Sequence, residues 1–175
     1  MFTKEVFPSV IAINTGIPFN AFNRSPMLFA SHKMGQFKII GAAIYQSDYA
    51  SQGPDGKSVK YIKNSGIPNL HVQLQFNSDD FLFGIAADYK SIQPRILVDT
   101  SLTSGINYVA DSKVNSIAYM GFFKYQKPNF VIKSKAVYGQ NLSENIMPGG
   151  YGVTSIDSLT GAESYSPFNH LYLWA

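Results

Sequence analysis

Charged and amide side chains occupy alternate positions in several segments of this sequence. Side chains of a β-strand point alternately to its two faces, so residues two positions apart share a face. Rows of lysines, carboxylates and amides can attract small solutes by charge and orient them by hydrogen bonds. The chemistry that this pattern indicates is selection of solutes. The candidate residues are Lys38, His71, Gln73, Gln75, Asp88, Lys90, Lys133 and Lys135.

Patterns typical of catalysis and metal binding are weak. His32, His71 and His170 lie far apart and have no metal-ligand spacing. No serine lies in a Gly-x-Ser-x-Gly motif, and the glycine-rich run at 149–152 lacks the Lys-Ser or Lys-Thr of a phosphate-binding loop. Basic residues are dispersed, which does not favour nucleic acid. We therefore expect no enzyme activity, no cofactor, no metal and no nucleic-acid partner.

The elements that would carry these residues begin with a Phe and end eight residues later with a Tyr, at 37–45, 81–89 and 130–138. Residues on the same face as each pair are uncharged, whereas the intervening positions include Lys38, Asp88, Lys133 and Lys135. Eight residues at roughly 3.3 Å each, tilted by about 40°, rise about 20 Å, which suits the apolar band of a transmembrane β-barrel. The predicted lipid-facing aromatic girdle is Phe37, Tyr45, Phe76, Phe81, Tyr89, Tyr125, Phe130 and Tyr138.

The strands are expected to form three hairpins, at about 27–46, 70–90 and 114–140. The connections between them, at about 47–69, 91–113 and 141–168, are long and rich in Gly, Pro, Ser, Asn and Asp. Short turns on one side and long outer loops on the other are typical of outer-membrane barrels. We predict an all-β, antiparallel transmembrane β-barrel, of which residues 1–175 supply one segment of about six to eight strands.

Composition agrees with a surface that faces lipid. Charged residues make up 14% of the chain, below the quarter or so that is usual for soluble domains, and aromatic residues also reach 14%. No apolar run is long enough for a transmembrane helix. We expect a bacterial outer-membrane location, a signal peptide missing from this sequence, and a sequence cut at both ends, with Leu171 to Ala175 belonging to a further strand.

On the barrel interpretation the lysines point into a water-filled lumen, because a lipid-facing Lys near the midplane costs about 2–4 kcal/mol. Two roles stay open for Lys38, Lys133 and Lys135: a bias toward anionic solutes, or solvated wall residues balanced by acidic groups elsewhere. Arg95, beside Pro94 in a long loop, either folds into the pore and joins a constriction or lies exposed in the loop.

Several strand and loop segments resemble the Bacteroidetes outer-membrane porins that are similar to the DcaP-type trimeric channels. The segments are Phe22-Asn-Arg-Ser-Pro26, Gly53-Pro-Asp-Gly56 before Tyr61-Ile-Lys-Asn64, residues 67–75, Asp88-Tyr-Lys90 with Pro94-Arg95, residues 138–142, and residues 155–167. The resemblance implies a sixteen-stranded barrel that assembles as a homotrimer and passes small, often anionic, solutes by diffusion. This chain is shorter than such a barrel, so we expect it to be an internal fragment.

Two functions are therefore weighed. The first is a porin whose partners are outer-membrane lipid and small solutes. The alternative is a soluble all-β ligand-binding or adhesin-like module, whose inner faces would also be apolar and whose long loops would make contacts.

Overall fold

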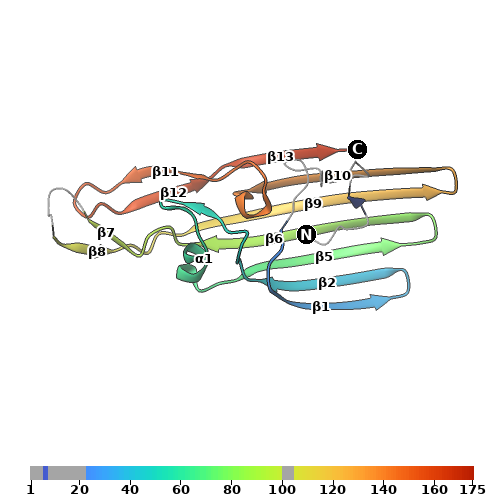
Figure 1. Ribbon diagram of the computed structural model, residues 1–175, viewed down its shortest axis with the longest axis horizontal. Coiled ribbons are helices and arrows are strands. Elements are labelled where there is room, and N and C mark those ends of the chain that lie inside the picture. The colour runs from blue at the N-terminus through green and yellow to red at the C-terminus, as the bar shows by residue number, and fades with distance from the viewer. Residues whose placement is uncertain (1–5, 8–22, 100–104) are drawn as a thin grey trace.

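The computed structural model describes residues 6–7, 23–99 and 105–175, and its main element is a seven-stranded antiparallel sheet (Figure 1). The order β1-β2-β5-β6-β9-β10-β13 follows the chain, so each strand lies beside the sheet strand that precedes it. The strands are β1 (Met27–Met34), β2 (Phe37–Ile44), β5 (Asn69–Asn77), β6 (Phe81–Ile92), β9 (Val114–Lys127), β10 (Phe130–Gln140) and β13 (Asn169–Trp174). The prediction of an antiparallel all-β fold is confirmed. The described strands form an open sheet, with β1 and β13 at its edges.

The long connections carry secondary structure that the sequence analysis treated as loop. The hairpins are β3 (Gln52–Gly53) with β4 (Gly56–Lys57), β7 (Leu97–Asp99) with β8 (Asn107–Val109), and β11 (Tyr151–Ile156) with β12 (Glu163–Pro167). The last two extend beyond the main sheet at the end opposite the short turns (Figure 1).

Turn-forming residues in these connections close short hairpins. Gly56, for example, has φ 78 at the start of β4, and the Asp157 carboxylate accepts N–H bonds from Leu159 and Thr160 after β11. Backbone donors and the Thr160 hydroxyl hold the pKa of Asp157 below its usual value.

Two short helical elements lie in the same connections, α1 (Lys60–Ser65) and the 3₁₀ turn Ser143–Asn145. In the described part of the chain, no helix has the length and apolar character to cross a membrane.

One face of the main sheet is apolar and exposed across all seven strands. Residues on β5, β6 and β9 alternate between buried and exposed, because successive side chains leave opposite faces. On the exposed face, Val72, Ile85 and Tyr119 keep 51%, 52% and 55% of their surface accessible. The large exposed side chains of this face are Leu28, Phe37, Ile39, Leu70, Val72, Leu74, Phe81, Phe83, Ile85, Ile117, Tyr119, Phe130, Ile132, Tyr138, Leu171 and Leu173.

The opposite face, called the inner face below, is mixed in character and is buried over much of β5, β6 and β9, whereas its residues on β1 are exposed. Its middle holds an apolar cluster that includes Met120, Phe122 and Val137, with Val6 packed among them. Burial of each such side chain contributes about 1.5–3 kcal/mol. This face was expected to contact water. Apolar side chains of β6, β9 and β10 instead pack with Val6 and exclude water here.

Gly84 allows one close contact in this cluster. It pairs with Phe122 across β6 and β9, and a Cβ at Gly84 would stand 2.2 Å from the Phe122 ring. Phe122 is 2% exposed, so its ring has no free space to enter.

We predict that Gly84→Ala lowers the free energy of unfolding by about 1–3 kcal/mol through overpacking. Gly41→Ala is the matched control, since a Cβ there meets nothing within 4 Å. The measurement is the denaturant midpoint of each variant. Equal effects at the two strand glycines would contradict the packing described.

Candidate functional site

Polar side chains of β5 and β6 form a hydrogen-bonded group on the inner face. His71 Nδ1 lies 3.0 Å from Asp88 Oδ1, and His71 Nε2 lies 3.1 Å from Gln73 Oε1. The His71 side chain is fully buried, whereas that of Asp88 is 19% exposed. The predicted row His71, Gln73 and Gln75 does share this face, and all three residues are buried. They therefore act first as structural hydrogen-bonding groups in this fold.

Lys90 is at the centre of a second buried group, which joins β6 to the connection that follows β10. Its ammonium donates to the Glu144 carboxylate, to the Asn141 carbonyl and to Ser51 Oγ at 3.4 Å. An ammonium has three N–H donors, so these contacts occupy all of them. Lys90 and Glu144 are 4% and 3% exposed. Lys90 was predicted to line a water-filled pore, and its burial against Glu144 contradicts that role.

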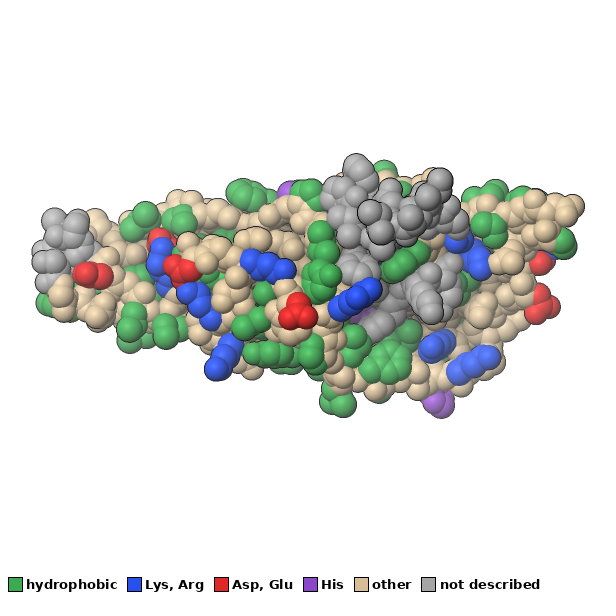
Figure 2. Space-filling view, viewed as in Figure 1, with side chains coloured by type: hydrophobic (Ala, Val, Ile, Leu, Met, Phe, Trp, Pro, Cys, Tyr) green, Lys and Arg blue, Asp and Glu red, His purple; other side chains and the backbone are tan. Residues whose placement is uncertain are grey.

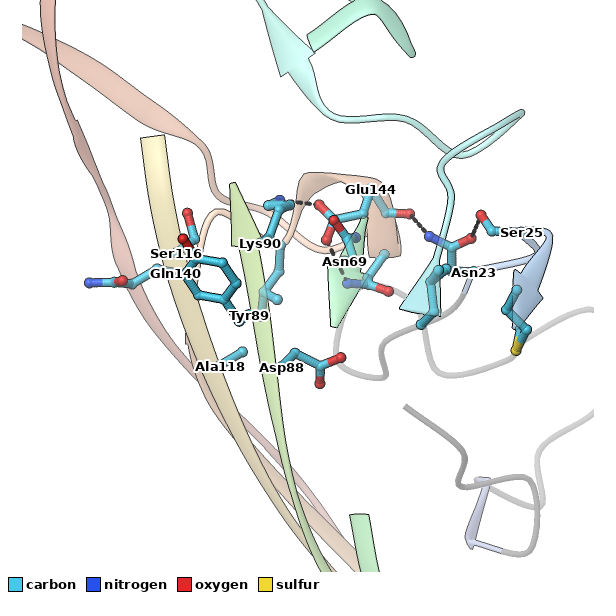
Figure 3. Close-up of a pocket in the computed structure, with 14 residues that line it drawn as sticks. Asn23, Ser25, Asn69, Asp88, Tyr89, Lys90, Ser116, Ala118, Gln140 and Glu144 are labelled. Atoms are coloured by element: carbon cyan, nitrogen blue, oxygen red, sulfur yellow. Dashed lines mark hydrogen bonds and ion pairs between the residues drawn. The ribbon is translucent and has the colours of Figure 1, made fainter. Parts of the chain in front are cut away.

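A pocket of about 210 Å³ lies beside this ion pair, at the long-loop end of the inner face (Figure 3). Residues of β1, β2, β5, β6, β9 and β10 and of the 3₁₀ turn contribute to it, and its polar lining includes Asn69, Asp88, Lys90, Ser116 and Glu144. Asn23 Nδ2 donates to the Glu144 carbonyl at 2.9 Å and so ties the segment before β1 to the same turn.

Lysines gather on the inner face toward the short-turn end of the sheet. Lys33 is directly opposite Lys38 across β1 and β2, and Lys124 is directly opposite Lys133 across β9 and β10. Figure 2 shows basic side chains on both halves of this view, including the right-hand half, where the short turns lie. Like charges in opposed positions are destabilising. Two such pairs give this end of the inner face a positive potential.

Lys133 and Lys135 also contact the start of the described chain. Lys133 Nζ donates to the Phe7 carbonyl at 3.0 Å, and the Lys135 ammonium lies 5.9 Å from the centroid of the Phe7 ring. Lys135 is 3% exposed, so the prediction that it faces open water is wrong for this structure. The cause is Phe7, which stands over the face where the sequence analysis expected solvent.

Arg95 lies in the long-loop region and not over the inner face of the sheet. Its Nε is 3.2 Å from Glu163 Oε2, and it lines a separate pocket with Tyr151 and Tyr165. Burial raises the pKa of Tyr151 to about 12, and burial together with the Glu163 hydrogen bond raises the pKa of Tyr165. Both phenols therefore stay neutral at physiological pH. Arg95 was expected either to join a pore constriction or to lie exposed in its loop. Its position beside Glu163 does not support the constriction.

The predicted girdle residues lie at the two ends of the exposed apolar face. Near the short turns, the rings of Phe81 and Tyr125 stack with centroids 4.6 Å apart, and Tyr125 meets Phe130 edge-on at 5.5 Å. Phe37 and Phe76 form a second pair at 5.3 Å. The Tyr45, Tyr89 and Tyr138 side chains lie toward the long-loop end, and the Tyr89 hydroxyl donates to Asn115 at 3.0 Å.

Several residues of the site were missed by sequence reasoning. Asn69 continues the row of His71, Gln73 and Gln75, so the alternation could have found it. Lys33 and Lys124 could have been found from the cross-strand register. No sequence pattern around Glu144 indicates its role, because Glu144 contacts Lys90 only when the connection after β10 folds back over the sheet.

Comparison with known proteins leaves the chain without an assigned family. No family model, no curated protein and no solved structure matches it. Among the described residues, no group of three or more His, Cys, Asp or Glu side chains could hold a metal ion.

We predict that Lys90→Met lowers the free energy of unfolding by about 3–5 kcal/mol, because it leaves the buried Glu144 carboxylate without its cation. The double variant Lys90→Met/Glu144→Leu should recover most of the loss, since it removes both charges. Denaturant titrations measure both effects. Lys60→Met, at the exposed Asp55–Lys60 pair, is the control and should change little. A Lys90→Met variant as stable as the control would be incompatible with a buried ion pair.

Proposed function

We propose that this chain forms part of the wall of an outer-membrane β-barrel that passes small hydrophilic solutes, with a preference for anions, by passive diffusion. The observation that carries the proposal is the apolar face exposed across all strands of the main sheet. Soluble monomers rarely expose contiguous apolar patches beyond a few hundred Å². An apolar face of this width, bounded by aromatic rings, is suited to contact with the hydrocarbon of a membrane.

The direction of the edge strands supports a larger barrel. Six successive antiparallel pairings separate β1 from β13, so the two edge strands run the same way. Joining them directly would create a parallel pair. Closure into an all-antiparallel barrel therefore needs an odd number of further strands, which gives the even total found in bacterial single-chain barrels. Closure would also satisfy the edge N–H and C=O groups, which lipid cannot do. The sequence resemblance implies sixteen strands, which is an even total. The sixteen-stranded barrel, assembled as a homotrimer, is therefore part of the proposal.

The lysines of the inner face support the anion preference. Lys33, Lys38, Lys124 and Lys133 lie toward the short-turn end, whereas the acidic partners on this face, Asp88 and Glu144, lie toward the long-loop end. A solute that crosses the lumen would meet net positive potential near the periplasmic mouth. At physiological ionic strength this potential is screened over about 8 Å, so it acts within the pore. The proposal assigns selection to the chain and no catalysis.

A soluble all-β module is the second candidate, and the covered apolar cluster around Val6 favours it. In that case the exposed face of the sheet would need another layer of protein. The two candidates differ in what the exposed face touches, which can be measured directly.

We predict that a spin label at residue 85 senses lipid when the protein is in vesicles. The sequence contains no cysteine, so Ile85→Cys and Tyr119→Cys each give a single attachment site on the apolar face. Collision with oxygen should be frequent and collision with a water-soluble nickel chelate rare. Leu159→Cys, 72% exposed between β11 and β12, is the control and should show the reverse. Frequent collisions with the nickel chelate at residue 85 would mean that the face meets water. Rare collisions with both oxygen and the chelate would mean that protein covers the face.

We also predict that Lys38→Gln/Lys133→Gln reduces the anion preference of the complete barrel that contains this chain, measured in planar bilayers. The reversal potential under a KCl gradient should move toward the cation-selective direction, because two inner-face charges are lost while glutamine keeps hydrogen-bond donors. Lys57→Gln/Lys63→Gln removes the same charge from β4 and α1, in the long-loop region, and serves as the control. The same shift in both double variants would assign the selectivity to overall charge and not to the inner face.

A further inference from the structure

Three residues that line the pocket beside Lys90 each have a side-chain oxygen without a hydrogen-bond partner. These oxygens are Asn69 Oδ1, Asp88 Oδ2 and Ser116 Oγ, and each atom is buried. Asn69 and Ser116 are 8% and 2% exposed as whole residues. A buried polar atom without a partner costs about 1–3 kcal/mol. Three such atoms around one pocket indicate that the pocket is shaped to receive hydrogen bonds from something inside it.

The unpartnered atoms come from three adjacent strands, β5, β6 and β9, and Figure 3 shows their side chains among those that line the pocket. Two of them can only accept a hydrogen bond, and the Ser116 hydroxyl can accept or donate. A single water needs only about 10–15 Å³ of such space. A pocket of about 210 Å³ is therefore large enough for a small solute.

Charge narrows the class of solute. The Lys90 and Glu144 charges offset each other, and the Asp88 carboxylate disfavours an anion in this pocket. Lys90 has its donors occupied by Glu144, Asn141 and Ser51, so it offers none to a solute. Apolar side chains, among them Met27 and Leu142, complete the lining. The best match is an uncharged molecule with several hydroxyl donors on a carbon skeleton.

We propose that this pocket is a binding subsite for a small neutral polyhydroxy solute, a polyol or a monosaccharide. Its hydroxyls donate to Asn69 Oδ1 and Asp88 Oδ2 and exchange a hydrogen bond with Ser116. The subsite rests on the proposed function in one respect, namely that the inner face is the wall along which solutes pass. It lies at the long-loop end, away from the lysines of the short-turn end, so neutral and anionic solutes meet different parts of the wall.

Binding is tested by saturation-transfer NMR on the full chain, folded in micelles of a detergent without a sugar headgroup. Sorbitol and glucose are the probes, and ethylammonium and succinate are the charged comparisons. We expect saturation transfer to sorbitol or glucose and none to the two ions. Ser116→Ala and Asp88→Asn should each weaken polyol binding at least fivefold. Ser164→Ala, in β12 and remote from the pocket, is the matched control and should bind as the parent chain does.

A stability measurement separates loss of binding from loss of fold. Ser116→Ala removes a buried hydroxyl without a partner, so its unfolding midpoint in the absence of polyol should equal or exceed that of the parent chain. The inference is overturned if ethylammonium binds in place of the polyols, if no solute binds and the pocket holds ordered water only, or if both pocket variants bind like the control.

This test uses neither vesicles nor conductance. Polyol binding by a chain whose residue 85 meets water in the spin-label measurement would leave the subsite standing and remove the porin. Lipid contact at residue 85 without polyol binding would leave the porin standing and remove the subsite.

Discussion

The separation of side chains onto two faces of one wide antiparallel sheet is the constraint on which the rest of the structure depends. Each strand places an apolar row on the exposed face and a mixed row on the inner face, and the register keeps these rows aligned from β1 to β13. A slip of one residue in any pairing would carry lysines and carboxylates to the apolar side. The hydrophobic match of that side to its surroundings would then be lost.

The inner face accommodates its polar groups in three different ways along the strands. Near the short turns, lysines stand opposite lysines and maintain positive potential. In the middle, Phe122 and its neighbours exclude water and bury Val6. Near the long loops, Lys90 and Glu144 neutralise each other while Asn69, Asp88 and Ser116 keep atoms without partners. The face therefore grades from charge, through an apolar centre, to a hydrogen-bonding pocket.

The long connections build the far end of the molecule. They carry three small hairpins, and the Arg95–Glu163 pair with Tyr151 and Tyr165 joins two of the connections. One connection returns to the sheet and delivers Glu144 to Lys90 across 54 positions of sequence. Such contacts order the connections without making them part of the main sheet.

The sequence by itself determined which residues share a face, where the short turns lie and that the fold is antiparallel β, because side-chain alternation and turn chemistry are local properties of the chain. It placed Lys38 and Asp88 on one side and Ile85 on the other for that reason. Only the tertiary structure decided that Lys90 is neutralised by Glu144, that Lys135 lies under Phe7 and that Arg95 belongs to the loop hairpins. Those outcomes depend on segments far apart in sequence meeting over the sheet, and the chain carries no local periodicity that specifies such meetings.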